Sequence, residues 1–115
     1  MGNKTDRPYE LSKSQYTKGV TCLKKVWLYN FKRELASPPS DFQEHLFSQG
    51  HEVGQMAREY FVGGELISES RDEALKAVEH TKNAINKKAP FIFEAAFIFE
   101  KILIRVDVLK INDDG

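Results

Sequence analysis

Residues 91–111 read FIFEAAFIFEKILIRVDVLKI, and this stretch decides the fold class. It is rich in Phe, Ile and Val, which are enriched in β-strands. Glu100-Lys101 is the only adjacent polar pair between its two apolar runs, so we place a two-residue turn there. The sequence therefore predicts an antiparallel β-hairpin in which Phe99 pairs with Ile102.

The residues before the hairpin have helical spacing instead. Three capping-box patterns introduce apolar runs: Ser12 with Gln15, Ser40 with Gln43, and Ser70 with Glu73. We expect helices near residues 13–31, 41–60 and 71–87, and a short strand at residues 65–68. The second helix has a stripe of apolar and small residues: Phe42, Leu46, Gly50, Val53, Gly54, Ala57 and Phe61. Its two glycines are tolerable inside a helix if another element packs closely against this stripe. Helices followed by a hairpin make an α+β fold with an incomplete sheet.

Composition limits the class of protein. The chain has 115 residues, 30% of them charged, which fits one small globular unit. We expect residues 1–10 to be a flexible terminus and residues 11–115 to be one domain. A single cysteine excludes an internal disulfide, and no signal peptide or long apolar run is present. A cytoplasmic protein without membrane segments is the expectation.

The formal charge is unevenly distributed. Residues 1–36 contain eight Lys or Arg against three Asp or Glu, a net charge of +5, and the remainder carries −5. A basic half could face the phosphates of a nucleic acid, or it could be an ordinary solvated helix surface.

Two carboxylates stand out in the hairpin. With Phe99 paired to Ile102, Glu94 faces Asp107 across the strands. Like charges directly opposite destabilise a sheet, and both lie in apolar runs. A divalent cation would explain the pair, because Mg²⁺ and Mn²⁺ prefer carboxylate oxygens. Alternatively, Arg105 or a lysine neutralises them, or the side chains lie in water at a sheet edge.

Five segments together resemble the RecB-like branch of the PD-(D/E)XK nucleases, in particular a bacterial family of CRISPR-associated-exonuclease-like proteins. The segments are residues 11–14 (LSKS), 19–29 (GVTCLKKVWLY), 50–61 (GHEVGQMAREYF), 92–97 (IFEAAF) and 104–109 (IRVDVL). The resemblance extends over nearly the whole chain. It implies that these residues form an incomplete restriction-endonuclease-like core.

The resemblance also implies site residues. Asp107 matches the catalytic, metal-binding aspartate, and Glu94 matches an acidic residue that supports the same Mg²⁺ or Mn²⁺. His51 lies close in sequence to the position where relatives have a metal-binding histidine, although its spacing from Gly50 differs from theirs. His80 matches no motif. The (D/E)-x-K strand that should follow is absent before Gly115. We therefore expect a missing C-terminal part of the same protein to complete the site.

Two further features follow from the resemblance. Cys22 matches the first ligand of a 4Fe-4S cluster found in some relatives, but such a cluster needs more thiolates than this chain has. Lys24, Lys25, Lys32 and Arg33 are candidates for gripping nucleic acid, with DNA preferred over RNA as the partner.

Two functional hypotheses remain. The chain is a fragment of a metal-dependent nuclease that cleaves phosphodiesters but is inactive alone. Alternatively, it is a small non-catalytic binding module, either a degenerate nuclease-like domain or an unrelated fold.

Overall fold

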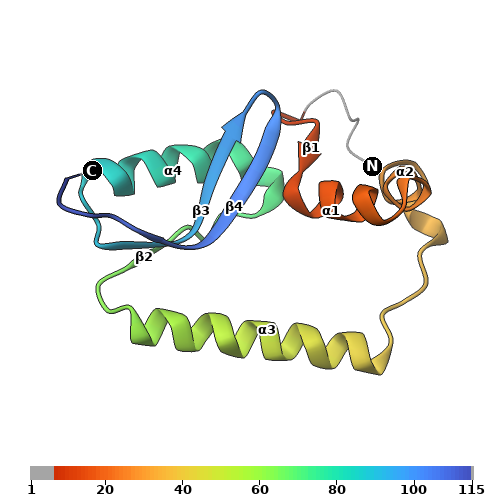
Figure 1. The fold of residues 1–115 in the computed structure, drawn as a ribbon, viewed down its shortest axis with the longest axis horizontal. Helices are drawn as coiled ribbons and strands as arrows, with labels where there is room; N and C mark the ends of the chain where they lie inside the picture. The colour runs from red at the N-terminus through yellow and green to blue at the C-terminus, as the bar shows by residue number, and fades with distance from the viewer. Residues whose placement is uncertain (1–6, 115) are drawn as a thin grey trace.

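A computed structural model describes residues 7–114, which form helices and one four-stranded mixed sheet (Figure 1). The α+β fold class is confirmed. In chain order the elements are β1 (Leu11–Ser12), α1 (Lys13–Thr21), α2 (Leu23–Phe31), η2 (Arg33–Leu35), α3 (Asp41–Tyr60), β2 (Glu65–Leu66), η3 (Arg71–Glu73), α4 (Ala74–Asn86), β3 (Phe91–Phe99) and β4 (Ile102–Lys110). The three predicted helical regions and the hairpin are therefore present.

The hairpin forms the centre of the sheet. β3 and β4 are antiparallel, and Phe99 pairs with Ile102 as predicted. Glu100 and Lys101 have φ values of 46° and 65°, the two positive values that a type I′ turn requires. β1 adds to β4 and β2 adds to β3, both in parallel, giving the order β1-β4-β3-β2.

The two outer strands are only two residues long. The strand expected at residues 65–68 is present as β2, and β1 was not anticipated. The turn before β2 depends on glycine, because Gly63 has a φ of +85° and a β-carbon on Gly64 would collide with the Phe93 ring. The short outer strands leave most of the hairpin without a third neighbour.

Capping explains where the helices begin. The side chains of Ser12 and Ser40 accept from the backbone of Gln15 and Gln43, and both reciprocal bonds are present. The Ser70 capping box was wrong. Ser70 precedes a 3₁₀ turn without a side-chain cap, and α4 begins only at Ala74.

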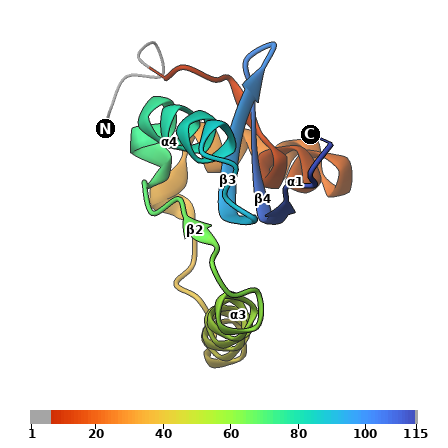
Figure 2. The same cartoon turned by 90° about the vertical axis from the view of Figure 1, so that its left-hand side faces the viewer.

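The main core lies between α4 and β3 (Figure 2). Its buried residues are Ile67, Ala77, Ala84, Ile92, Ala95 and Ala96. Thr81 is also buried, and its Oγ1 donates to the Ala77 carbonyl at 2.8 Å and accepts from the Ala96 amide at 2.9 Å. The helix therefore satisfies the backbone of β3 beyond the point where β2 ends.

Helix α3 lies apart from the sheet, joined to the rest by extended connections (Figures 1 and 2). None of its residues is buried, and the exposed ones include Phe47, Val53 and Met56. The last residue of the apolar stripe, Phe61, packs against Phe91 of β3 with ring centroids 4.9 Å apart, so the stripe meets another element at the C-terminal end of the helix. Spacing predicts which residues share a face, but not what covers that face.

Residues 1–6 of the expected flexible terminus lie outside the described part of the chain. Within it, Tyr9 is only 7% exposed and packs with Ala74 and Leu103. The Glu10 amide donates to the Lys101 carbonyl at 2.7 Å. Residues 9 and 10 are thus held against the hairpin turn.

None of the helices in residues 7–114 combines the length and apolar character needed to cross a membrane.

We expect Lys88→Gly to stabilise the chain by about 1 kcal/mol. Lys88 follows α4 with a φ of 56°, and bonds from the Lys88 amide to Ile85 and from the Ala89 amide to Ala84 form a Schellman motif. Glycine adopts this conformation without steric cost. Urea unfolding monitored by circular dichroism measures the change. Lys82→Gly, at an exposed position inside α4, is the control and should destabilise by about 1 kcal/mol. Equal losses of stability in Lys88→Gly and Lys82→Gly would contradict the left-handed conformation of Lys88 at the end of α4.

Candidate functional site

Glu94 and Asp107 occupy corresponding positions on β3 and β4. The pairs on either side of them are Phe93 with Val108 and Ala95 with Val106, the register predicted from sequence. The ladder does not include the carboxylate pair itself, because Glu94 has a φ of 58° in the left-handed region. Such a conformation costs on the order of 1–3 kcal/mol for a residue other than glycine. Strain of this kind inside a strand is typical of functional positions.

The surroundings of Glu94 and Asp107 test whether Arg105 neutralises them or whether they lie in water at a sheet edge. Arg105 does not neutralise the carboxylates: its guanidinium donates to the backbone oxygens of Ile67 and Glu69, both at 3.0 Å. Glu94 is half-buried, whereas Asp107 is exposed. The outer strands pair only with residues 92–93 and 102–103, so no third strand borders the hairpin at this level. Asp107 therefore has the environment of a sheet-edge residue.

The described residues contain no preformed site with three or more His, Cys, Asp or Glu side chains arranged to hold a metal ion. His51 belongs to α3 and is exposed on a helix that lies apart from the hairpin (Figure 1). Two carboxylates suit Mg²⁺ or Mn²⁺ chemically, but they leave most of the coordination shell to water.

The predicted basic residues do come together. Lys24, Lys25, Lys32 and Arg33 line one hollow of about 340 Å³ beside α2, which we call the α2 hollow. Leu28 and Leu35 form part of its apolar wall, and the exposed Cys22 lies at it. Cys22 is the only cysteine, so these residues cannot hold an iron–sulfur cluster by themselves. The exposed lining of the hollow is nearly all apolar, so the charged groups of these residues and of Lys18 do not form its surface. Contact of the four predicted cations with an anionic polymer would therefore take place around the hollow, not inside it.

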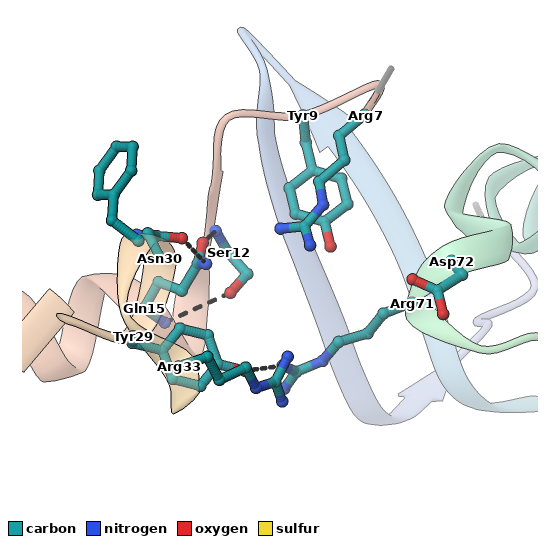
Figure 3. A pocket seen from close by; sticks show the side chains of 10 residues that line it. Arg7, Tyr9, Ser12, Gln15, Tyr29, Asn30, Arg33, Arg71 and Asp72 are labelled. Atoms are coloured by element: carbon teal, nitrogen blue, oxygen red, sulfur yellow. Dashed lines mark hydrogen bonds between the residues drawn. The ribbon is translucent and has the colours of Figure 1, made fainter. Parts of the chain in front are cut away.

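A second hollow, of about 410 Å³, was not predicted; we call it the arginine pocket (Figure 3). Its lining residues come from the segment before β1, from β1, from the start of α1, from the end of α2, and from η2 and η3: Arg7, Tyr9, Ser12, Gln15, Tyr29, Asn30, Phe31, Arg33, Arg71 and Asp72. Arg7 and Arg71 are 64 positions apart, and no local pattern links them. Only the tertiary fold brings them together.

The wall of the arginine pocket is fixed by hydrogen bonds. Gln15, 3% exposed, is held by the Ser12 capping box, and its Nε2 donates to Asn30 Oδ1 at 2.8 Å. Arg71 donates from Nη1 to the Tyr29 hydroxyl at 3.3 Å and from Nη2 to Ser14 Oγ at 3.2 Å. These bonds connect α1, α2 and η3 around the pocket.

Two shared arginines link neighbouring hollows into one basic surface. Arg33 lines both the α2 hollow and the arginine pocket. Arg71 lines the arginine pocket and a third hollow, the β4 hollow, which reaches Leu103 and Arg105 on β4. The remaining residues of the β4 hollow are Ser12, Lys13, Ser14 and Thr17. Cationic side chains thus extend from α2 to the strand that bears Asp107.

His80 forms an ionic cluster that no sequence motif indicated. On α4, its Nδ1 lies 2.9 Å from Glu69 Oε1 and its Nε2 lies 2.8 Å from Glu65 Oε1. Hydrogen bonds to the two carboxylates, first to Glu69 and then to Glu65, raise the pKa of His80 above 6.5. The bond to His80 lowers the pKa of Glu69 below 4.5. The cluster connects α4 to β2, through Glu65, and to the segment that follows β2, through Glu69.

No protein-family model, curated protein or solved structure matches the chain.

We expect the His80 cluster to make stability depend on pH. Because the pKa of His80 is higher in the folded state, its ionic contacts stabilise the fold fully below pH 6.5. This stabilisation is lost as pH rises through the raised pKa. The lowered pKa of Glu69 acts oppositely: its contribution is full above pH 4.5 and is lost in acid. Arg105, which also faces Glu69, stays charged throughout. Unfolding by urea at pH 6 and pH 9 should show lower stability at pH 9.

His80→Gln should remove most of this decline, whereas His45→Gln, at an exposed position on α3, should keep it. If wild type and His80→Gln lose the same stability between pH 6 and pH 9, the cluster is not the cause of the pH dependence.

Proposed function

We propose that the chain is the nucleic-acid-gripping part of a metal-dependent nuclease domain of the PD-(D/E)XK superfamily, RecB-like branch. One observation carries the proposal: Glu94 adopts a strained conformation at the level of Asp107 in the hairpin. A structural role does not require a carboxylate there, because glycine would adopt this φ without strain. Catalytic and metal-binding positions are where such strain is commonly kept.

In this proposal, Asp107 and Glu94 hold Mg²⁺ or Mn²⁺. The bound cation would polarise a phosphodiester and lower the pKa of a water. The chain's own residues supply two carboxylates and a basic surface leading towards β4. The third acidic group and the lysine of the (D/E)-x-K motif are assigned to a strand of the same protein outside residues 7–114. Residues 7–114 are therefore proposed to be inactive alone, with DNA as the preferred polymer and the cytoplasm as the location.

A second candidate function is non-catalytic binding of nucleic acid. It is favoured by two observations: residues 7–114 contain no three-ligand metal group, yet their basic side chains gather around adjoining hollows. In this case Glu94 and Asp107 would have no metal to hold. Metal binding distinguishes the two functions.

We expect the chain to bind Mn²⁺ weakly, with a Kd on the order of millimolar for two carboxylates and several waters. Glu94→Gln and Asp107→Asn should each weaken this binding several-fold, because each removes one of the two anionic ligands. Electron paramagnetic resonance of free Mn²⁺ measures the Kd. Asp113→Asn, outside the hairpin, is the matched control and should leave it unchanged. Unchanged Mn²⁺ binding in both site variants would favour the non-catalytic function.

The same proteins should not cleave single- or double-stranded DNA or RNA in Mg²⁺ or Mn²⁺. Cleavage by the parent that disappears in Asp107→Asn would show that the site is complete, against the proposal. Cleavage that persists in Asp107→Asn would identify a contaminant.

We expect nucleic acid to bind the basic side chains around the α2 hollow through its phosphates, independently of base sequence. The logarithm of the binding constant should fall linearly with the logarithm of salt concentration, and each of Lys24→Gln, Lys25→Gln and Lys32→Gln should reduce that slope by about 1. Fluorescence anisotropy with a labelled oligonucleotide at several salt concentrations gives the slopes. Lys82→Gln on α4 is the control. Binding insensitive to salt would contradict a phosphate-gripping role.

A further inference from the structure

We propose that the arginine pocket binds a phosphomonoester dianion, such as the terminal phosphate of a nucleic-acid strand or the phosphate of a free mononucleotide. The assignment to a strand end rests on the proposed function, whereas the phosphate chemistry does not. The pocket is separate from Glu94 and Asp107, neither of which lines it.

Charge is the first argument. Three guanidiniums, those of Arg7, Arg33 and Arg71, line the pocket against the single carboxylate of Asp72, a formal excess of +2. Among the described residues, none of the three arginines is in an ion pair. Figure 3 shows Arg33 and Arg71 extending towards one another and Arg7 reaching down from the segment before β1. Three cations lining one pocket with a single carboxylate leave an excess of positive charge that favours binding of an anion.

The donors are held in position by neutral partners. Arg71 is anchored by the Tyr29 and Ser14 hydroxyls, and those two bonds use only part of its five N–H groups. The Arg33 guanidinium lies 4.8 Å from the Tyr29 ring centroid. A guanidinium fixed in this way keeps N–H groups for a bidentate bond to phosphate oxygens, without first having to break a salt bridge.

Recognition should depend mainly on the phosphate. Of the aromatic residues that line the pocket, Tyr29 and Tyr9 are unavailable to a nucleobase, and the half-exposed Phe31 packs beside Trp27 with ring centroids 5.6 Å apart. Lys18 and Arg33 lie over the Tyr29 ring at 4.4 Å and 4.8 Å, and Tyr9 is buried. An excess of +2 matches a phosphomonoester, which carries about −1.5 to −2 at neutral pH, better than a diester with one negative charge. The pocket's volume of about 410 Å³ accommodates a phosphate with its sugar.

The test compares single-stranded DNA oligonucleotides of one sequence that bear a 5′-phosphate, a 3′-phosphate or hydroxyls only. Binding is followed by fluorescence anisotropy in EDTA, which removes divalent metal and so separates this site from Glu94 and Asp107. We expect phosphorylated strands to bind about ten-fold more tightly than the hydroxyl strand, which corresponds to about 1.4 kcal/mol. AMP and inorganic phosphate, used as competitors, distinguish a strand end from a free nucleotide or phosphate as the source of the ligand.

Arg7→Gln and Arg71→Gln should each abolish the preference for phosphorylated strands. Arg7 is the cleaner variant, because Arg71 also connects η3 to α1 and α2. Arg58→Gln, on α3 and outside the pocket, is the matched control and should keep the preference. A preference retained in Arg7→Gln and Arg71→Gln would overturn the site. So would a wild type that shows no preference and binds neither AMP nor inorganic phosphate, whatever the outcome of the Mn²⁺ measurements.

Discussion

The antiparallel pairing of β3 with β4 is the interaction on which the rest of the structure depends. Each outer strand contributes two residues and pairs with one strand of the hairpin, so neither β1 nor β2 forms a sheet without it. Its turn imposes two positive φ values on Glu100 and Lys101, which are less suited to them than Asn and Gly. The pairing along nine-residue strands, together with burial of Ile92 and Ala96 under α4, outweighs that local cost.

The hairpin also determines where the arginine pocket forms. The carbonyl of Lys101 accepts from the Glu10 amide, and Leu11 and Ser12 then continue alongside β4. Ser12 caps α1 and thereby fixes Gln15, whose amide bonds to Asn30 on α2. A series of hydrogen bonds thus connects the hairpin turn to α1 and α2. This path explains how residues from distant parts of the chain form one basic pocket.

The sequence predicted the features that local rules determine. The hairpin register followed from period-two alternation and one polar pair, and two helix starts followed from Ser12 and Ser40. Ser70 failed because the same spacing introduces a 3₁₀ turn. β1 is too short to show a pattern, and the clustering of Arg7 with Arg71, or of His80 with Glu65, depends on long-range packing. The stripe on α3 has proper helical spacing, yet none of its residues is buried, because periodicity does not specify a partner.

The basic surface and the carboxylate pair are connected through single side chains. Arg33 lines the α2 hollow and the arginine pocket, and Arg71 lines the arginine pocket and the β4 hollow. Arg105 continues the series onto β4, two positions before Asp107. Arg105 is itself held in place by backbone oxygens of Ile67 and Glu69, so it marks a fixed end of the series. Under the proposed function, an anionic chain lying along these cations would extend towards β4. Phosphate binding would then need no metal, and the polymer would lie close to the strand where the proposed metal acts.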